Sequence, residues 1–283
     1  MIIFKKTRDL HKWLEAQRLA GISIGFVPTM GALHTGHLSL IESSIKANPV
    51  TVCSIFVNPT QFNDPKDFEK YPITIEKDIE LLANAGCDIL FLPSVKEIYP
   101  DELSPSLKYD LGYLERILEG RFRPGHFQGV CMVVHRLLEI VMPDNLYLGQ
   151  KDYQQCMVIK KLIALIGLSN AILVNICPTL REPDGLAMSS RNVRLNEDER
   201  IKATAIFRNL SFIKENLTTG DLKGLKETAF RNLSEAGFNV DYIEIADAND
   251  LSIIDDWDGQ KKLVALAAAF MKEVRLIDNI LLN

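Results

Sequence analysis

The chain has 283 residues, of which 47% are hydrophobic and 24% are charged, and its formal net charge is −5 at pH 7. This is the composition of an ordinary globular protein, long enough for two domains that each bury a core. The acidic balance argues against bulk nucleic-acid binding, and no apolar run reaches the length of a membrane span. We expect a cytoplasmic protein, because the amino-terminal residues carry charges throughout and contain no secretory apolar segment.

Strand-like and helix-like patterns alternate through the first two-thirds of the chain. An amphipathic helix is expected from about Thr7, before the first predicted strand. The predicted strands are 23–29, 50–57, 88–93, 145–149 and 171–177, and the predicted helices between them are 36–47, 74–85, 127–141 and 152–166. This order predicts an α/β fold with a Rossmann-like, doubly wound parallel sheet and helices on both faces.

The pattern changes near residue 180, where a polar, turn-rich segment begins. After it come two predicted helices and three predicted strands, at about 197–216, 222–236, 240–248, 261–270 and 274–281. This order is typical of a smaller α+β domain. We therefore predict two domains, 1–180 and 181–283. We expect the second to act as a lid that rotates near Gly185 and to be associated with a dimer.

The cysteines are odd in number, lie far apart and form no CxxC pair. We interpret them as reduced and mostly buried side chains, with no disulfide and no catalytic thiol. They are Cys53, Cys87, Cys131, Cys156 and Cys177.

The loop after the first strand of the predicted sheet reads PTMGALHTGH, residues 28–37. Gly31 and Gly36 allow the backbone to approach a ligand closely, and a helix begins near Gly36. The amino-terminal end of a helix suits a phosphate group, and His34 and His37 can face it together. Imidazolium donors there would stabilise charge that builds on a phosphate during transfer. Walker A and GxGxxG motifs are absent, which excludes the usual phosphate loops.

Polar groups also follow the later strands, at the edge where open parallel sheets bind ligands. Asn58, Gln61 and Tyr71 come after the strand 50–57 and are suited to orienting a small polar ligand. Asp78 lies on the next helix and is a candidate for binding Mg²⁺ through water.

Three further segments carry residues suited to anions: Arg121, Arg123 and His126; Lys151, Asp152 and Gln155; and Ser189, Ser190 and Arg191. The first two precede or open a helix, and the third supplies two hydroxyls and a guanidinium near the domain boundary. Taken singly, each also fits a solvated loop, a polar linker or a helix cap. Their occurrence together after successive strands favours a nucleotide site.

With these motifs the chain resembles the pantoate–β-alanine ligase family over essentially its full length. PTMGALHTGH is similar to that family's version of the HxGH signature of class I nucleotidyl-transfer folds. FVNPTQF, YP, RPGHF, GQKDYQQ and DGLAMSSRN match the family in order and spacing. The resemblance implies condensation of (R)-pantoate with β-alanine through pantoyl adenylate, with ATP converted to AMP and pyrophosphate. It also implies Mg²⁺ and a homodimer, with neither nucleic acid nor a membrane as partner.

The resemblance assigns roles to individual residues of this chain. His37 is implied as the proton donor, with His34, Lys151 and Arg191 as further catalytic groups. The implied ATP contacts are Met30, Gly31, Ala32, Leu33, His34, Thr35, Gly36, His37, Gly149, Gln150, Lys151, Asp152, Leu180, Met188, Ser189, Ser190 and Arg191. The substrate candidates are Gln61 and Gln155 for pantoate, with Gln61 also near β-alanine, and in addition Asn58, Tyr71, Arg123 and His126. Asp78 matches a Mg²⁺-linked acidic position.

Two positions depart from the family, and two other functions stay open. Ile73 stands where Arg is common after the Tyr-Pro pair, and Lys77 stands where some members carry another acid.

One alternative is a nucleotidyltransferase that leaves the adenylate in a dinucleotide product. The other is a nucleotide-sensing or RNA-binding module on a class I synthetase-like fold, against which the acidic pI of about 5.6 argues.

Overall fold

The computed structural model describes residues 1–62, 68–100 and 108–283, which divide into two compact units. Unit 1 comprises Met1–Gly149 and Val158–Pro178, and unit 2 comprises Gln150–Met157 and Thr179–Asn283. The sequence-based division placed the segment Gln150–Met157 in the first domain, whereas in the structure it packs with the second. Side chains far along the sequence hold it there, and the period of a sequence pattern carries no information about such contacts.

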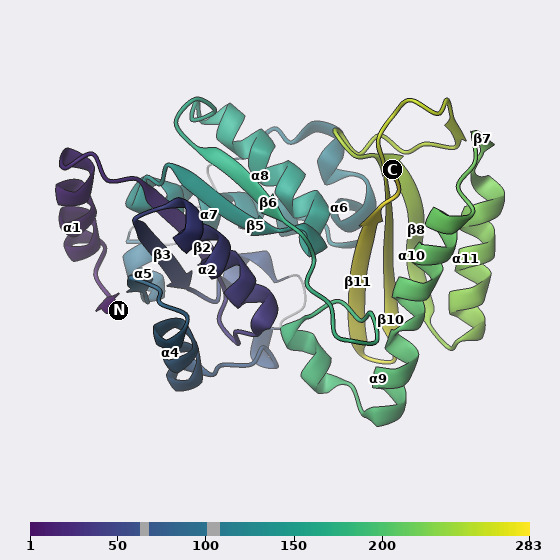
Figure 1. The fold of residues 1–283 in the computed structure, drawn as a ribbon, viewed down its shortest axis with the longest axis horizontal. Helices are drawn as coiled ribbons and strands as arrows, with labels where there is room; N and C mark the ends of the chain where they lie inside the picture. The colour runs from purple at the N-terminus through teal and green to yellow at the C-terminus, as the bar shows by residue number, and fades with distance from the viewer. Residues whose placement is uncertain (63–67, 101–107) are drawn as a thin grey trace. The chain divides into compact units, whose positions relative to one another are not determined.

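Unit 1 is built on a parallel sheet, of which β2, β3, β5 and β6 are labelled in Figure 1. In the described residues the sheet has six strands in the order β1-β4-β3-β2-β5-β6. The strands are β1 (Ile2–Phe4), β2 (Ile24–Thr29), β3 (Val50–Ile55), β4 (Ile89–Phe91), β5 (Asn145–Gly149) and β6 (Leu173–Cys177). The predicted α/β fold is confirmed, and β1 is an addition at the sheet edge. The chain runs from β2 outward to β3 and β4, and then returns to β5 on the other side of β2. Open α/β sheets bind ligands at the carboxyl ends of the strands beside such a reversal.

Helices cover both faces of this sheet. The described helices of this unit are α1 (Thr7–Leu19), α2 (Thr35–Ala47), α4 (Ile75–Asn84), α5 (Val95–Ile98), α6 (Leu118–Phe122), α7 (His126–Val141) and α8 (Tyr153–Leu165), the last of which begins in unit 2. On one face, Ile41 of α2 and Leu82 of α4 pack with Val27 of β2 in a single apolar cluster. The next residue back, Phe26, points to the other face and is also fully buried. On that face α7 contacts β2, and α1 packs on α7.

Unit 2 is an antiparallel sheet covered by helices, as predicted for the smaller domain (Figure 1). Its main strands are β8 (Asn239–Asp247), β10 (Leu263–Met271) and β11 (Val274–Leu281), in the order β11-β10-β8, and a small pair joins β7 (Gly220–Asp221) to β9 (Asp256–Trp257). Its helices are α9 (Glu197–Ala203), α10 (Ala205–Glu215) and α11 (Lys223–Glu235). The single helix predicted at 197–216 is interrupted at Thr204, whose hydroxyl donates back to the carbonyl of Ile201 (2.8 Å).

Across the described ranges, no helix has both the length and the apolar character that a bilayer span requires.

Candidate active site

The loop after β2 turns sharply at Gly31. Gly31 has φ +82° and Ala32 has φ +49°, both in the left-handed region. A Cβ atom on Gly31 would lie 3.0 Å from Ile55 Cγ2 and 3.1 Å from Asp78 Oδ2, so only glycine fits without displacing a neighbour. The hydroxyl of Thr29 accepts from the Gly31 N–H (3.2 Å), which closes the start of the loop.

Asp78 holds the next part of this loop. Its fully buried carboxylate accepts hydrogen bonds from the backbone N–H groups of Ala32 (2.9 Å) and Leu33 (2.8 Å) and from the hydroxyl of Thr74 (3.0 Å). It also lies in the first turn of α4, where the helix dipole favours a negative charge. These bonds offset the left-handed conformation of Ala32, which costs about 1–2 kcal/mol.

Helix α2 begins directly after this loop, with His34 as its N-cap. The rings of His34 and His37 lie 4.0 Å apart between centroids and are tilted by 34°. His37 Nδ1 accepts a long hydrogen bond from the His34 backbone N–H (3.4 Å), which leaves the ring proton on Nε2. An imidazolium is therefore not needed for donation, because the neutral ring donates from Nε2. The first turn of α2 carries no acidic residue, so the helix start suits an anion.

The turn after β3 places Gln61 against the loop after β2. This turn is the short helix η1 (Pro59–Gln61), and Gln61 Nε2 donates to Met30 Sδ at 2.8 Å. His126 Nδ1 donates to the backbone carbonyl of Gln61 (2.8 Å), and its Nε2 accepts from Arg123 Nη1 (3.1 Å). A carbonyl only accepts and a guanidinium only donates, so this arrangement corresponds to a neutral His126 with its proton on Nδ1.

Asn58 supports the same turn from the inside. Its Nδ2 donates to the carbonyl of Gly129 (3.1 Å) and to Gln61 Oε1 (3.4 Å), and its Oδ1 accepts from the Tyr99 hydroxyl (3.0 Å). Burial raises the pKa of Tyr99 to about 12, so this hydroxyl keeps its proton at neutral pH. A Cβ atom on Gly129 would lie 2.3 Å from the carbonyl oxygen of Thr60, which shows how closely η1 approaches α7. Asn58 and His126 both hydrogen-bond to Gln61, and their expected contact with substrate stays a prediction.

The remaining candidate residues of unit 1 differ in their exposure to solvent. Tyr71 is buried and packs edge-on against Phe62, with ring centroids 5.8 Å apart. Arg121 is exposed and lies over the ring of its neighbour Phe122. Ile73 is 72% exposed and Lys77 is also exposed, so both departures from the family change the surface and leave the buried carboxylate of the same region untouched.

In unit 2, the short helix η3 (Gln150–Asp152) follows β5 and carries Lys151. The Lys151 side chain is 18% exposed, and its Nζ lies 3.8 Å from Asp152 Oδ2. Gln155 follows in the first turn of α8 and is half-buried. The ammonium group of Lys151 and the side-chain amide of Gln155 therefore come from one continuous stretch of backbone.

Residues 180–188 form a small hairpin that pairs two candidate ATP contacts. The Met188 N–H donates to the carbonyl of Leu180 at 3.1 Å. Gly185 makes the turn with φ +92°, and a Cβ atom there would lie 2.3 Å from the ring of Phe207. This packing leaves no room for a side chain at Gly185, and the rotation expected near it stays a prediction.

The serine–arginine segment follows the hairpin directly. Ser189 caps the short helix η4 (Ser190–Arg194), and its Oγ accepts from the Arg191 N–H at 3.3 Å. Asn192 Nδ2 donates to the carbonyl of Ala187 (3.1 Å), which ties η4 back to the hairpin. The hydroxyls of Ser189 and Ser190 and the guanidinium of Arg191 thus belong to one short, internally bonded segment.

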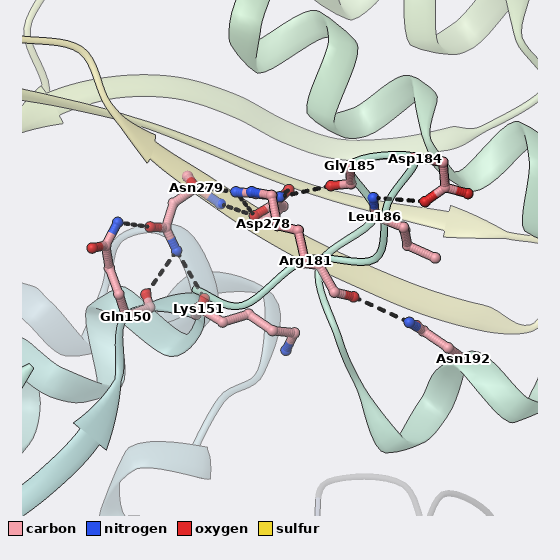
Figure 2. A network of polar contacts seen from close by, with 10 residues as sticks. Gln150, Lys151, Arg181, Asp184, Gly185, Leu186, Asn192, Asp278 and Asn279 are labelled. Carbon is pink, nitrogen blue, oxygen red and sulfur yellow. Dashed lines mark hydrogen bonds and ion pairs between the residues drawn. The ribbon is translucent and has the colours of Figure 1, made fainter. Parts of the chain in front are cut away.

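Three residues that no sequence motif predicted connect η3 and the hairpin through β11 (Figure 2): Arg181, Asp278 and Asn279. Asp278 and Asn279 are 5% and 2% exposed. A sequence signal exists for one of them, because Asp278 stands in the row of apolar residues that β11 turns toward the core. A buried carboxylate in such a row needs a partner.

Magnesium requires several oxygen ligands in near-octahedral geometry. Both oxygens of Asp78 already accept from protein donors, and its side chain is fully buried. In the part of the chain that the structure describes, no group of three or more His, Cys, Asp or Glu side chains could hold a metal ion. The residues present therefore do not fit the expected Mg²⁺ site at Asp78, either directly or through water.

Comparison with known proteins gives one consistent result. The family model described as pantoate-beta-alanine ligase matches residues 2–281. The pantothenate synthetase of Cytophaga hutchinsonii is 44% identical over 287 residues, covering 100% of this chain and 99% of the relative. That of Porphyromonas gingivalis is 43% identical over 282 residues, covering 99% of each chain.

Solved structures agree with these sequence matches. The crystal structure of pantothenate synthetase from Thermus thermophilus has a TM-score of 0.85 and 38% identity, covering 99% of each chain. The pantoate-beta-alanine ligase of Francisella tularensis, complexed with beta-gamma ATP and beta-alanine, has a TM-score of 0.81 and 38% identity. It covers 99% of this chain and 97% of that one.

Proposed function

The chain belongs to the pantoate–β-alanine ligase family and joins pantoate to β-alanine at the expense of ATP, and we propose that it does so through a pantoyl adenylate. The pantoate carboxylate attacks the α-phosphorus of ATP, and the bond to pyrophosphate breaks as the new O–P bond forms. The amine of β-alanine then attacks the acyl carbon and loses a proton, and AMP leaves as the amide bond of pantothenate forms.

The observation that carries this proposal is the start of α2. His34 and His37 lie side by side there, with the ring proton of His37 on Nε2, and no carboxylate stands in the first turn. Negative charge increases on the phosphate oxygens during attack at phosphorus, and fixed donors at a helix amino terminus stabilise that charge. Asp78 keeps the preceding loop in the shape that presents these donors.

Lys151 and the serine–arginine segment are the second proposed set of phosphate contacts. Lys151 contributes a point charge from η3, and Arg191 contributes a planar fork of donors beside the hydroxyls of Ser189 and Ser190. Their role is to bind the triphosphate and to stabilise the departing pyrophosphate. Leu180 and Met188, paired across the hairpin, offer an apolar contact to the adenosine.

Gln61 and Gln155 are the proposed pantoate contacts, with Gln61 also close to β-alanine. A side-chain amide offers both donors and acceptors, so it orients a hydroxy acid without removing its protons. Gln61 is half-buried on η1, whose backbone is fixed by His126. Arg123 donates to His126 Nε2, and its expected contact with substrate stays a prediction.

Four further expectations remain predictions: Mg²⁺, a homodimer, a cytoplasmic location and the lid function of residues 181–283. The Francisella tularensis relative was solved in complex with beta-gamma ATP and beta-alanine, which supports ATP and β-alanine as substrates of this chain. We propose that magnesium enters bound to the phosphates of ATP, because Asp78 is fully buried and both of its oxygens already accept from protein donors. No step above depends on it.

A coupled assay tests the function. With ATP and pantoate alone, the protein should release pyrophosphate and keep the adenylate bound, giving about one equivalent per site, as expected for a water-excluding site. Addition of β-alanine should start steady release of AMP and pantothenate. A dinucleotide product, or pyrophosphate release that does not need pantoate, would overturn the proposal.

A further inference from the structure

A polar network in unit 2 joins β11 to both of its proposed ATP-binding segments (Figure 2). The strand contributes Asp278 and Asn279, which follow each other and therefore point to opposite faces. One side chain reaches the hairpin and the other reaches η3. Both lie away from solvent, at 5% and 2% exposure.

Asn279 fixes the backbone that carries Lys151. Its Nδ2 donates to the carbonyl oxygens of Gln150 (2.9 Å) and Lys151 (2.8 Å), and its Oδ1 accepts from Gln150 Nε2 (3.2 Å). Both donors and the acceptor of this amide are thus used within the protein. Because two successive carbonyls point at one nitrogen, the orientation of both peptide planes is set by a single side chain.

Arg181 and Asp278 hold the hairpin on the same strand. Arg181 forms a bidentate pair with Asp278, at 2.6 Å and 3.0 Å, and donates to the carbonyls of Gly185 and Asn279, each at 3.1 Å. Its guanidinium also lies over the ring of Phe207, 4.1 Å from the centroid. Burial raises the pKa of Asp278, and the adjacent Arg181 opposes this rise. These four hydrogen bonds join the hairpin to β11, so the Arg181–Asp278 pair serves as an anchor.

We propose that Asn279 is a positioning residue for adenylate formation, acting through Lys151. This inference rests on the proposed contact of Lys151 with the phosphates of ATP. Asn279 itself does not reach substrate, since every polar atom of its amide is bound to η3. Removal of the amide frees the peptide planes that aim the Lys151 side chain, and a misplacement of about 1 Å costs on the order of 10²-fold in rate.

The test is a double-mutant cycle on the complete chain. Asn279→Ala should slow pyrophosphate release from ATP and pantoate by roughly 10- to 100-fold. The rate at which added pantoyl adenylate reacts with β-alanine should change less than about twofold, because Lys151 serves only the first step. Lys151→Ala should cost roughly 10²- to 10³-fold. The double variant should lose little more than Lys151→Ala alone, because nothing remains for Asn279 to position.

Asn209→Ala is the matched control. Asn209 lies on α10 of the same unit, is 8% exposed, and donates from Nδ2 to the carbonyl of Ala205 at 2.9 Å. Asn209→Ala should lower the free energy of unfolding. It should not slow pyrophosphate release more than it slows the reaction of pantoyl adenylate with β-alanine. Should Asn279→Ala fail to fold, Asn279→Ser, which retains one donor, goes through the same cycle.

Two results would overturn the inference. One is a double variant in which the two losses multiply, and the other is an Asn279 variant that slows both half-reactions alike. A wild-type chain that forms no adenylate would refute the proposed function instead, so the two failures are distinguishable.

Discussion

Replacement of Asp78 tests whether this buried carboxylate anchors the loop after β2 or binds Mg²⁺. Asp78→Asn preserves the shape of the side chain but turns one acceptor oxygen into a donor. If the retained oxygen keeps Leu33 and Thr74, the new NH₂ group faces the backbone N–H of Ala32, which loses its 2.9 Å hydrogen bond. The loop then loses the contact that holds Ala32 at φ +49°.

The magnitude follows from these contacts. One hydrogen bond to a charged group contributes about 1.5–3 kcal/mol, and a buried N–H left without a partner costs about 1–3 kcal/mol. Because Asp78 is fully buried, solvent does not screen the effect. We expect the free energy of unfolding to fall by about 3 kcal/mol. That corresponds to a melting temperature lower by about 6–12 °C in a domain of this size.

Two measurements decide between the roles. Urea unfolding gives the stability, and pyrophosphate release at varied Mg²⁺ gives the metal requirement. The loop-anchor role predicts lower stability, a lower rate and an unchanged Mg²⁺ requirement. Glu76→Gln is the control, because Glu76 is an exposed carboxylate in the same first turn of α4 and undergoes the same chemical change. An Asp78→Asn variant of normal stability that needs much more Mg²⁺ would refute the reasoning.

Three further predictions follow from the site. His37→Ala should slow single-turnover pyrophosphate release by roughly 10²- to 10³-fold, and a near-normal rate in a folded variant would remove His37 from the mechanism. Gly129→Ala forces a Cβ to 2.3 Å from the Thr60 carbonyl oxygen, so we expect a loss of about 1–3 kcal/mol and a larger rise in KM for pantoate than for ATP. Equal rises would indicate general damage to the fold. Burial raises the pKa of Cys87 and of Cys131 to about 12, so mass spectrometry should find both unmodified by iodoacetamide at about pH 8 until urea unfolds the chain, and rapid native labelling would contradict their burial.

The fold was predictable wherever a segment was long and strongly periodic. The strands 50–57 and 145–149 and the helix 127–141 were expected from their apolar patterns, and the structure has β3, β5 and α7 there. The three-residue strand β1 was missed, because it is too short to show a period and is specified by pairing with β4. The break at Thr204 was missed because no glycine or proline between residues 197 and 216 marks it in the sequence.

The site was predictable only at the level of loops. The motif around His34 and His37 and the position of Gln61 after a strand identified which loops carry chemistry. The use of Asp78 as a loop anchor was not predictable, because a helix carboxylate looks the same in sequence whether it faces solvent or the N–H groups of Ala32 and Leu33. Asn279 escaped notice because its partners lie far away in sequence.

Asn279 and Lys151 are 128 residues apart along the chain. A ribosome adds about 5–20 residues per second, so roughly 6–26 s separate the synthesis of the lysine from that of its anchor. The loop after β2 has its own anchor, Asp78, only 46 residues from Ala32, and is complete far earlier. With Asn279 positioning Lys151 as proposed, a nascent chain therefore acquires its phosphate contacts in a fixed order. The loop after β2 comes first, and Lys151 comes second. The chain does not reach its full rate of ATP consumption until β11 has left the ribosome and joined its sheet.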